Sequence, residues 1–203
     1  MPPRANELHR ISPYLLIWHA FDGAAKTELF STAVITQHGT IVIDPIALTD
    51  VAEQELNECG RIASIILTNA NHVRDAISFH QRYAAPIFAA IELTKKVPNA
   101  QAVNDAIAIH DLRIIGLDGA ARGELAVYDP RDGGSVIVGD VLINFDPYGF
   151  TLLPRKYCLN QKVMIRCLHR LLDLEFQRLL FAHGTPIAAR ASERLQSLLA
   201  EVQ

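Results

Sequence analysis

The start of the chain contains short, mostly apolar segments of strand-like character. This pattern predicts strands at residues 14–18, 29–36 and 40–44. The last two are separated only by the turn-forming sequence Gln37-His38-Gly39. Because the strands follow one another closely, we expect a β-meander.

The next part of the chain alternates between helical and strand patterns. Thr49 or Asp50 can cap a helix that ends near residue 59, before Gly60. The apolar run 62–67 then predicts a strand that is buried on both faces. A helical pattern over 72–84 and a short strand at 87–89 follow, so we expect β-α-β crossovers.

The second half predicts a hairpin, further helices and one more strand. Residues 91–113 show only weak helical patches, around 97–107. The later elements are strands at 123–128 and 135–138, a helix from 160 to about 174, a strand at 178–182 and a closing helix after Thr185-Pro186. Since neither a repeat nor a low-complexity linker interrupts the chain, we predict a single domain over residues 1–203, with two mixed sheets and helices on their outer faces.

Composition narrows the class of protein. The chain has 203 residues, of which 50% are hydrophobic and 20% charged, and a formal net charge of -3. Such a chain can bury a full core without a disulfide or a structural metal. The basic residues are scattered, so we predict no nucleic-acid partner. No apolar run approaches the roughly 20 residues of a membrane span, so we predict no membrane contact.

The cysteines and the N-terminal segment bear on the compartment. Cys59, Cys158 and Cys167 have no Cys-x-x-Cys spacing, which favours reduced, buried thiols over a disulfide framework. The first residues carry charges and prolines before a short apolar run, unlike a signal peptide. We therefore expect a cytoplasmic protein.

Candidate chemistry lies in four segments that follow predicted strands, at residues 43–45, 67–75, 138–140 and 181–184. In layered α/β proteins, loops at one end of the strands gather functional side chains. The sequence has no Gly-x-Ser-x-Gly elbow, no recognisable Cys-His pair and no dinucleotide or phosphate loop. The four segments therefore carry the functional prediction.

The order and spacing of these segments resemble the metallo-β-lactamase fold superfamily, from about Ser12 to Thr185. In that superfamily a meander ends in an aspartate, and a buried strand ends in Leu-Thr before a His-x-His-x-Asp-His loop. A Gly-His-Thr-Pro-Gly segment then precedes a hairpin, a Gly-Asp follows it, and the last strand ends in a His near Gly. The matching segments are Ile41-Val42-Ile43-Asp44, Ile66-Leu67-Thr68 with Asn69-Ala70-Asn71-His72-Val73-Arg74, Gly119-Ala120-Ala121-Arg122-Gly123-Glu124-Leu125, Gly139-Asp140 and His183-Gly184. The resemblance implies an α/β fold of the four-layer αββα sandwich type, with mixed sheets.

Most positions that hold metal in the family are substituted here. The replacements are Asn69 and Asn71 for the two first histidines of the loop, Val73 and Arg74 for its aspartate and last histidine, and Ala120 for the later histidine. Alanine and valine offer no donor atom, and an amide oxygen is a poor substitute for imidazole. Only Asp140 and His183 are retained. We therefore predict a hydrolase-like protein without the dinuclear zinc site, either a pseudoenzyme or a cleft-binding protein, with no cofactor.

The substituted residues suggest what the cleft contains instead. Arg74 is permanently charged and has no lone pair, so it could pair with Asp140 and replace the charge of the metal. Asn69, Asn71, Arg74 and Asp44 would then line a cleft for a small-molecule ligand, with Asp44 as an orienting acceptor.

His72 leaves an alternative open. Together with Asp140 and His183 it gives three donors, enough for one zinc, manganese or iron ion and for catalysis. The protein would then be a metal-dependent hydrolase of ester, thioester, lactone or phosphoester substrates. We prefer the interpretation that His72 begins the following helix and bonds to backbone. A structural or interaction protein that can form homo-oligomers is a third alternative.

Overall fold

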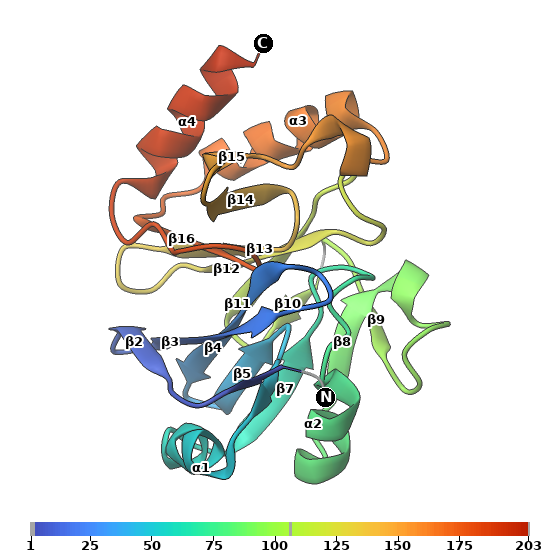
Figure 1. Ribbon diagram of the computed structural model, residues 1–203, viewed down its shortest axis with the longest axis vertical. Helices are drawn as coiled ribbons and strands as arrows, with labels where there is room; N and C mark the ends of the chain where they lie inside the picture. Colours follow the sequence, from blue (N-terminus) through green and yellow to red (C-terminus); the bar gives the residue numbers. More distant parts are fainter. Residues whose placement is uncertain (1–2, 106, 203) are drawn as a thin grey trace. The chain divides into compact units, whose positions relative to one another are not determined.

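The structure is a computed structural model that describes residues 3–105 and 107–202. The chain divides into two units, Met1–Ala102 and Val103–Gln203 (Figure 1). Each unit contains a mixed sheet with helices packed on it, as the sequence predicts. The single domain over residues 1–203 stays a prediction.

The sheet of the first unit begins with the predicted meander. Its strands, in spatial order, are β2 (His9–Ser12), β3 (Leu15–Asp22), β4 (Thr27–Thr36), β5 (Gly39–Ile43), β7 (Ile62–Ile66), β8 (Ile87–Ala90) and β9 (Gln101–Val103). Strands β2 to β5 are antiparallel neighbours, whereas β5, β7 and β8 run parallel. Beside this sheet, β1 (Arg4–Ala5) pairs in parallel with β6 (Ala47–Leu48). The parallel strands align their carboxyl ends, where candidate residues follow β5 and β7.

Two helices and a short 3-10 turn complete the first unit. They are α1 (Asp50–Glu58), α2 (Ala76–Tyr83) and η1 (Ile91–Leu93). Figure 1 shows α1 and α2 on the same side of their sheet. Helix α1 agrees with the sequence prediction, since Thr49 precedes it and Cys59 follows it.

Helix α2 begins at Ala76, so the predicted start at residue 72 is wrong. The side chain of Asn69 accepts the backbone N–H of Asn71 at 2.8 Å, and His72 N–H bonds to the Asn69 carbonyl at 3.2 Å. Local side-chain bonds of this kind compete with helix formation. The apolar spacing around Val73 therefore imitates a helix while the backbone forms turns.

The second unit repeats the order of antiparallel strands followed by a parallel pair. Its sheet is ordered β10 (Ala108–Ile109), β11 (Leu112–Gly116), β12 (Leu125–Asp129), β13 (Ser135–Val138) and β16 (Arg178–Phe181). Only β13 and β16 in this described sheet pair in parallel. The hairpin of β14 (Leu142–Phe145) and β15 (Gly149–Leu152) was not predicted.

The weak helical prediction around 97–107 is wrong for the residues of that segment that the structure describes. Residue 106 lies outside the described residues. Gln101–Val103 form β9, and Pro98 and Asn99 precede it. Proline lacks the N–H that a helix needs, and Asn99 has a φ of 65°. Together they end any helical turn before β9.

The second unit carries helices α3 (Gln161–His169) and α4 (Ala191–Glu201) and 3-10 turns η2 (Arg155–Tyr157) and η3 (Arg170–Asp173). The predicted helix from 160 to 174 is thus α3 continued by η3. The closing helix starts later than the Thr185-Pro186 signal predicts. Ile187 exchanges two backbone hydrogen bonds with Leu179 of β16, both 2.9 Å, and this bridge keeps the chain extended.

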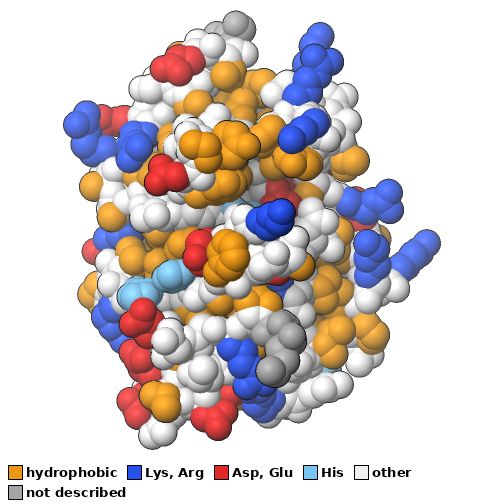
Figure 2. All heavy atoms as spheres, in the orientation of Figure 1, with side chains coloured by type: hydrophobic (Ala, Val, Ile, Leu, Met, Phe, Trp, Pro, Cys, Tyr) orange, Lys and Arg blue, Asp and Glu red, His pale blue; other side chains and the backbone are white. Residues whose placement is uncertain are grey.

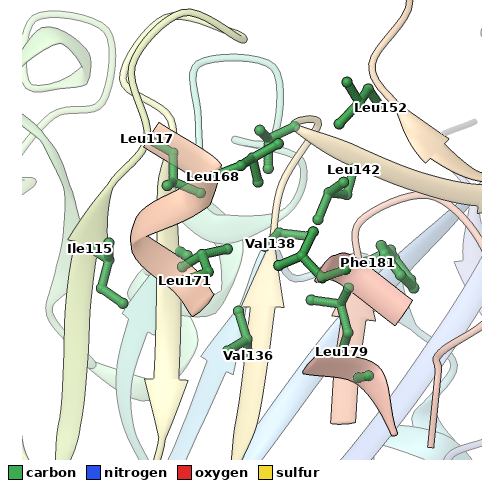
Figure 3. Close-up of a cluster of buried hydrophobic side chains, with 14 of the residues drawn as sticks. Ile115, Leu117, Val136, Val138, Leu142, Leu152, Leu168, Leu171, Leu179 and Phe181 are labelled. Carbon is green, nitrogen blue, oxygen red and sulfur yellow. The ribbon is translucent and has the colours of Figure 1, made fainter. Parts of the chain in front are cut away.

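A buried apolar cluster fixes the second unit's sheet to its helices (Figure 3). Val136 and Val138 of β13 and Leu179 and Phe181 of β16 alternate along their strands, as strand geometry requires. Leu168 of α3 packs against them and is fully buried. Each such side chain contributes about 1.5–3 kcal/mol on burial, so the ends of β13 and β16 are held rigidly.

The surface and the thiols add two observations. Figure 2 shows basic and acidic side chains spread over the face in view, with hydrophobic ones between them. Among the described residues, no helix has the length and apolarity to cross a membrane. The cysteines are free thiols, but they are partly exposed rather than buried as expected. Burial still raises the pKa of Cys158.

Candidate functional site

In the first unit, the carboxyl ends of β5 and β7 bring Asp44 and Thr68 together. The parallel ladder pairs Ile43 with Ile66, and Asp44 N–H extends it to the Ile66 carbonyl at 3.0 Å. Asp44 then takes a φ of 50°, a conformation that aspartate tolerates better than most residues. Its carboxylate accepts the Thr68 N–H at 2.8 Å and also the Thr68 hydroxyl. Asp44 and Thr68 are both buried.

His72 adds an imidazole to this pair. Its Nδ1 lies 3.0 Å from Asp44 Oδ2 and 2.8 Å from Thr68 Oγ1. An ionised carboxylate only accepts, so we assign the hydrogen of the neutral ring to Nδ1 and the lone pair to Nε2. The preferred sequence interpretation of His72 is therefore wrong, because its ring bonds to two side chains and it does not begin α2.

The backbone of Asp44 is fixed by two further side chains. Ser31 Oγ donates to the Asp44 carbonyl at 2.7 Å and accepts the N–H of Ile46 at 2.8 Å. Arg74 Nη1 donates to the Asp44 carbonyl at 3.0 Å and also to the carbonyl of Phe30. Arg74 thus bonds to backbone carbonyls of its own unit. Its pairing with Asp140 stays a prediction.

The two asparagines of the loop differ in exposure. Asn69 is buried, and its Oδ1 holds the turn by accepting Asn71 N–H, whereas Asn71 is exposed. The amide oxygen of Asn69 is therefore engaged in local structure. Val73, at the aspartate position of the motif, has no donor atom.

In the second unit, the parallel pair β13 and β16 brings together the two retained ligand positions. Val138 is aligned with Phe181, and Ala182 N–H donates to the Val138 carbonyl at 3.1 Å. Asp140 and His183 each lie two residues beyond those aligned positions. His183 Nε2 is 3.4 Å from Asp140 Oδ1, and the two side chains are 17% and 11% exposed. The two residues that the sequence prediction named, Asp140 and His183, therefore have side chains that lie next to each other.

The loop of His183 is tied to β14. Gly184 forms a parallel bridge with Asn144, whose N–H bonds to the His183 carbonyl at 3.2 Å. Thr185 N–H returns to the Asn144 carbonyl at 2.9 Å. Gly184 has a φ of 111°, and a Cβ there would collide with the Asn144 backbone. The position therefore requires glycine.

Ala120 belongs to the core of the second unit. It is completely buried within the apolar cluster, and its carbonyl accepts the N–H of Leu159 at 3.0 Å. The preceding Gly119 has a φ of 96°, and a Cβ there would meet the backbone of α3. The position of the family's later histidine is therefore part of the apolar core in this chain.

Sequence reasoning missed two polar residues at these strand ends. It assigned no site role to Thr68 or to Glu124. Glu124 is buried, and its Oε1 accepts the N–H of Val141, the residue after Asp140, at 3.2 Å. A charged residue between a glycine-containing loop and an apolar strand was the available signal.

Comparisons with known proteins agree on one family. The family model described as "Metallo-beta-lactamase superfamily" matches residues 6–202. A search of curated proteins gives no match. The DIM-1 metallo-β-lactamase exposed to ceftazidime is similar in structure, with a TM-score of 0.75, 12% identity and coverage of 100% of both chains.

Two further solved structures are similar at low identity. A metallo-β-lactamase from Pontibacter korlensis has a TM-score of 0.74 and 17% identity, with coverage of 96% of this chain and 98% of the other. TTHA1623, solved in a di-iron-bound form, has a TM-score of 0.61 and 20% identity, with coverage of 83% of this chain and 92% of the other. At these identities the similarity shows the metallo-β-lactamase fold, which confirms the predicted fold class.

Proposed function

The chain belongs to the metallo-β-lactamase superfamily, and from that premise we propose a hydrolase-like protein with a reduced site for one metal ion. Asp140 and His183 are the donors that hold the ion. The sequence alternative that adds His72 as a third donor stays a prediction. This proposal places the single-ion alternative ahead of the metal-free interpretation that the sequence alone favours.

The distance between Asp140 and His183 carries the proposal. Two ligands that each lie about 2.1 Å from a tetrahedral ion are about 3.4 Å from each other. Asp140 Oδ1 and His183 Nε2 are 3.4 Å apart. A carboxylate and an imidazole are also the donors that zinc, manganese and iron accept. The pair therefore fits one ion.

A dinuclear centre fits these residues poorly. Ala120 and Val73 have no donor atoms, and Ala120 is packed in the core. The Asn69 amide oxygen is engaged on the N–H of Asn71. A second ion would have to rely on weak or absent ligands, so the proposal is limited to one.

The contacts of His72 within the first unit set the tautomer of its ring. Metal-binding histidines commonly donate their other ring N–H to a carboxylate or carbonyl, which sets the tautomer and the ring orientation. Asp44 and Thr68 receive the Nδ1 hydrogen of His72 in this way.

The chemistry follows from these donors. A bound divalent ion would act as a Lewis acid and lower the pKa of a water molecule towards about 7. Asp140 would supply negative charge beside His183. Esters, thioesters, lactones and phosphoesters are the proposed substrate classes, because each is cleaved by water at a polarised carbonyl or phosphorus centre.

Metal stoichiometry tests this function. Protein purified without chelator and dialysed separately against zinc, manganese and iron should retain close to one ion per chain by elemental analysis. Asp140→Ala and His183→Ala should each abolish retention, whereas His169→Ala, a control on helix α3, should leave it unchanged.

Activity provides the second measurement. Nitrophenyl esters, a thioester, a lactone and a phosphodiester should be assayed with and without chelator, and hydrolysis of at least one class should depend on the ion. Near-zero metal content would overturn the proposal and leave a metal-free, cleft-binding protein. Hydrolysis that a chelator does not affect would equally contradict it.

A further inference from the structure

Glu124 is a buried carboxylate in the second unit that the proposed function does not use. It is 3% exposed and lies directly before β12. Its carbonyl accepts the N–H of Leu117 at 2.9 Å, which extends the β11–β12 ladder beyond the pairing of Gly116 with Leu125. The backbone of Glu124 is therefore fixed by the sheet, and its side chain projects from a rigid base.

One partner of this carboxylate is the peptide that follows Asp140. Glu124 Oε1 accepts the N–H of Val141 at 3.2 Å. Residues 139–141 lie between β13 and β14, outside both strands. The Val141 carbonyl accepts the N–H of Leu153 at 3.1 Å. In a regular sheet, a backbone carbonyl of the neighbouring strand would accept such an N–H. For Val141, the side-chain oxygen of Glu124 accepts it instead.

This bond restricts the direction of the Asp140 side chain. The peptide between Asp140 and Val141 is planar, so holding its N–H fixes the ψ angle of Asp140. That angle sets the Cα–Cβ direction relative to the neighbouring strand end, where His183 lies 3.4 Å from the carboxylate. A ligand pair needs this precision, because metal sites tolerate only small departures from ideal distances.

Energetics also favour a specific role for Glu124. Burying a carboxylate is costly unless hydrogen bonds compensate for lost water. An apolar side chain of the same size would fill the space beside β12 without that cost. The Val141 N–H supplies one such hydrogen bond, so the carboxylate is specifically engaged at the peptide that follows Asp140.

We propose that Glu124 is a positioning residue that holds the Val141 amide so that the Asp140 carboxylate stays aligned with His183. This inference rests on the proposed function for its metal readout only. Its structural readout is independent of metal.

Two variants separate positioning from core filling. Glu124→Gln keeps an oxygen that can accept the Val141 N–H, while Glu124→Met keeps the size and removes the acceptor. Asp129→Asn is a matched control, since Asp129 is a buried carboxylate at the opposite end of β12 that bonds to Arg131. Any general effect of altering a buried acid on this strand appears in the control.

The first measurement is amide hydrogen exchange of metal-free protein by NMR. Exchange at Val141 in Glu124→Met should accelerate at least tenfold relative to Ile137 in β13. In Glu124→Gln and Asp129→Asn the ratio should stay within about threefold of wild type. An unchanged ratio in Glu124→Met would overturn the inference, whether or not the protein binds metal.

The second measurement is zinc affinity against a chromophoric competitor. Loss of a group that supports metal ligands typically weakens affinity about 10–100-fold, and we expect this for Glu124→Met with recovery in Glu124→Gln. Wild-type affinity in Glu124→Met would overturn the positioning role even if Val141 exchange increases. If wild-type protein binds no zinc, manganese or iron, the proposed function fails, and the exchange ratio alone decides the role of Glu124.

Discussion

The carboxylate of Asp44 lies 3.0 Å from Nδ1 of His72, and both side chains are buried. Asp44 directly follows the parallel strand β5, and His72 lies in the loop after β7. The strand alignment thus places an acceptor beside an imidazole that is distant in sequence. The same arrangement of parallel strand ends joins Asp140 and His183 in the second unit.

Removing the Asp44 carboxylate should destabilise the first unit. In Asp44→Ala, the Thr68 N–H and the His72 ring lose their shared acceptor in a buried environment. A buried donor without a partner costs about 1–3 kcal/mol, so the free energy of unfolding should fall by at least that amount in urea denaturation. Asp50→Ala, at the exposed start of α1, should cost less than about 1 kcal/mol. Equal losses in the two variants would contradict the role given to Asp44.

Restoring the family's histidine at position 120 should not restore a second ion. Ala120 is fully buried in the apolar cluster, so an imidazole there overpacks the core and should cost about 1–3 kcal/mol in thermal or chemical denaturation. Ala121→His, at a partly exposed neighbouring position, should be tolerated. Metal analysis should find no more than one ion per chain in Ala120→His. Two ions would show that the core adapts and that the second site persists.

Much of the fold was predictable because the apolar periodicity follows the burial of each element. The meander, α1, β7 and the β12–β13 hairpin all appear close to their predicted bounds. The start of α2 was misread because the Asn69 side chain stabilises turns, a bond that periodicity does not reveal. The start of α4 was misread because Ile187 pairs with Leu179, which a local capping signal cannot anticipate.

The candidate site was predictable only in part. Asp140 and His183 follow strands with aligned ends, so family order sufficed to select them. The contacts of His72 with Asp44 depend on the conformation of a loop without regular structure, and sequence position alone favoured a different role. The role proposed for Glu124 depends on one side chain reaching the backbone of Val141, 17 residues away.

Tyr83 should make stability depend on alkaline pH. Burial and the hydrogen bond to Glu53 raise its pKa from 10.0 to about 12. The folded state thus favours the neutral phenol, so the contribution is complete below pH 10 and is lost as pH rises towards about 12. Tyr83→Phe should lower the free energy of unfolding by about 1 kcal/mol at pH 8 and flatten its decline above pH 10. Urea denaturation across this range checks both effects.

Tyr157→Phe provides the comparison for Tyr83, since Tyr157 is 62% exposed. Its removal should leave both the stability at pH 8 and the alkaline slope near those of wild type. If Tyr83→Phe retains the wild-type slope above pH 10, another group causes the alkaline loss and the interpretation of Tyr83 is wrong.

Gly184 offers a test of how the backbone positions His183. Both Gly184 and Gly149 have positive φ values, 111° and 64°, but a Cβ at Gly149 meets open space whereas one at Gly184 collides with Asn144. Gly149→Ala should therefore cost only the backbone strain, about 1 kcal/mol. Gly184→Ala should cost about 3 kcal/mol, because the bridge to Asn144 must also open.

The two glycine variants should also differ in metal retention. Opening the bridge at Gly184 releases the carbonyl of His183 from Asn144, so the imidazole loses its alignment with Asp140. We expect Gly184→Ala to bind zinc at least tenfold more weakly in competition titrations, at a temperature where it remains folded by circular dichroism. Gly149→Ala, on the β15 side of the same hairpin, should keep wild-type affinity. Equal affinity in the two variants would mean that the Asp140–His183 geometry does not depend on the glycine at 184.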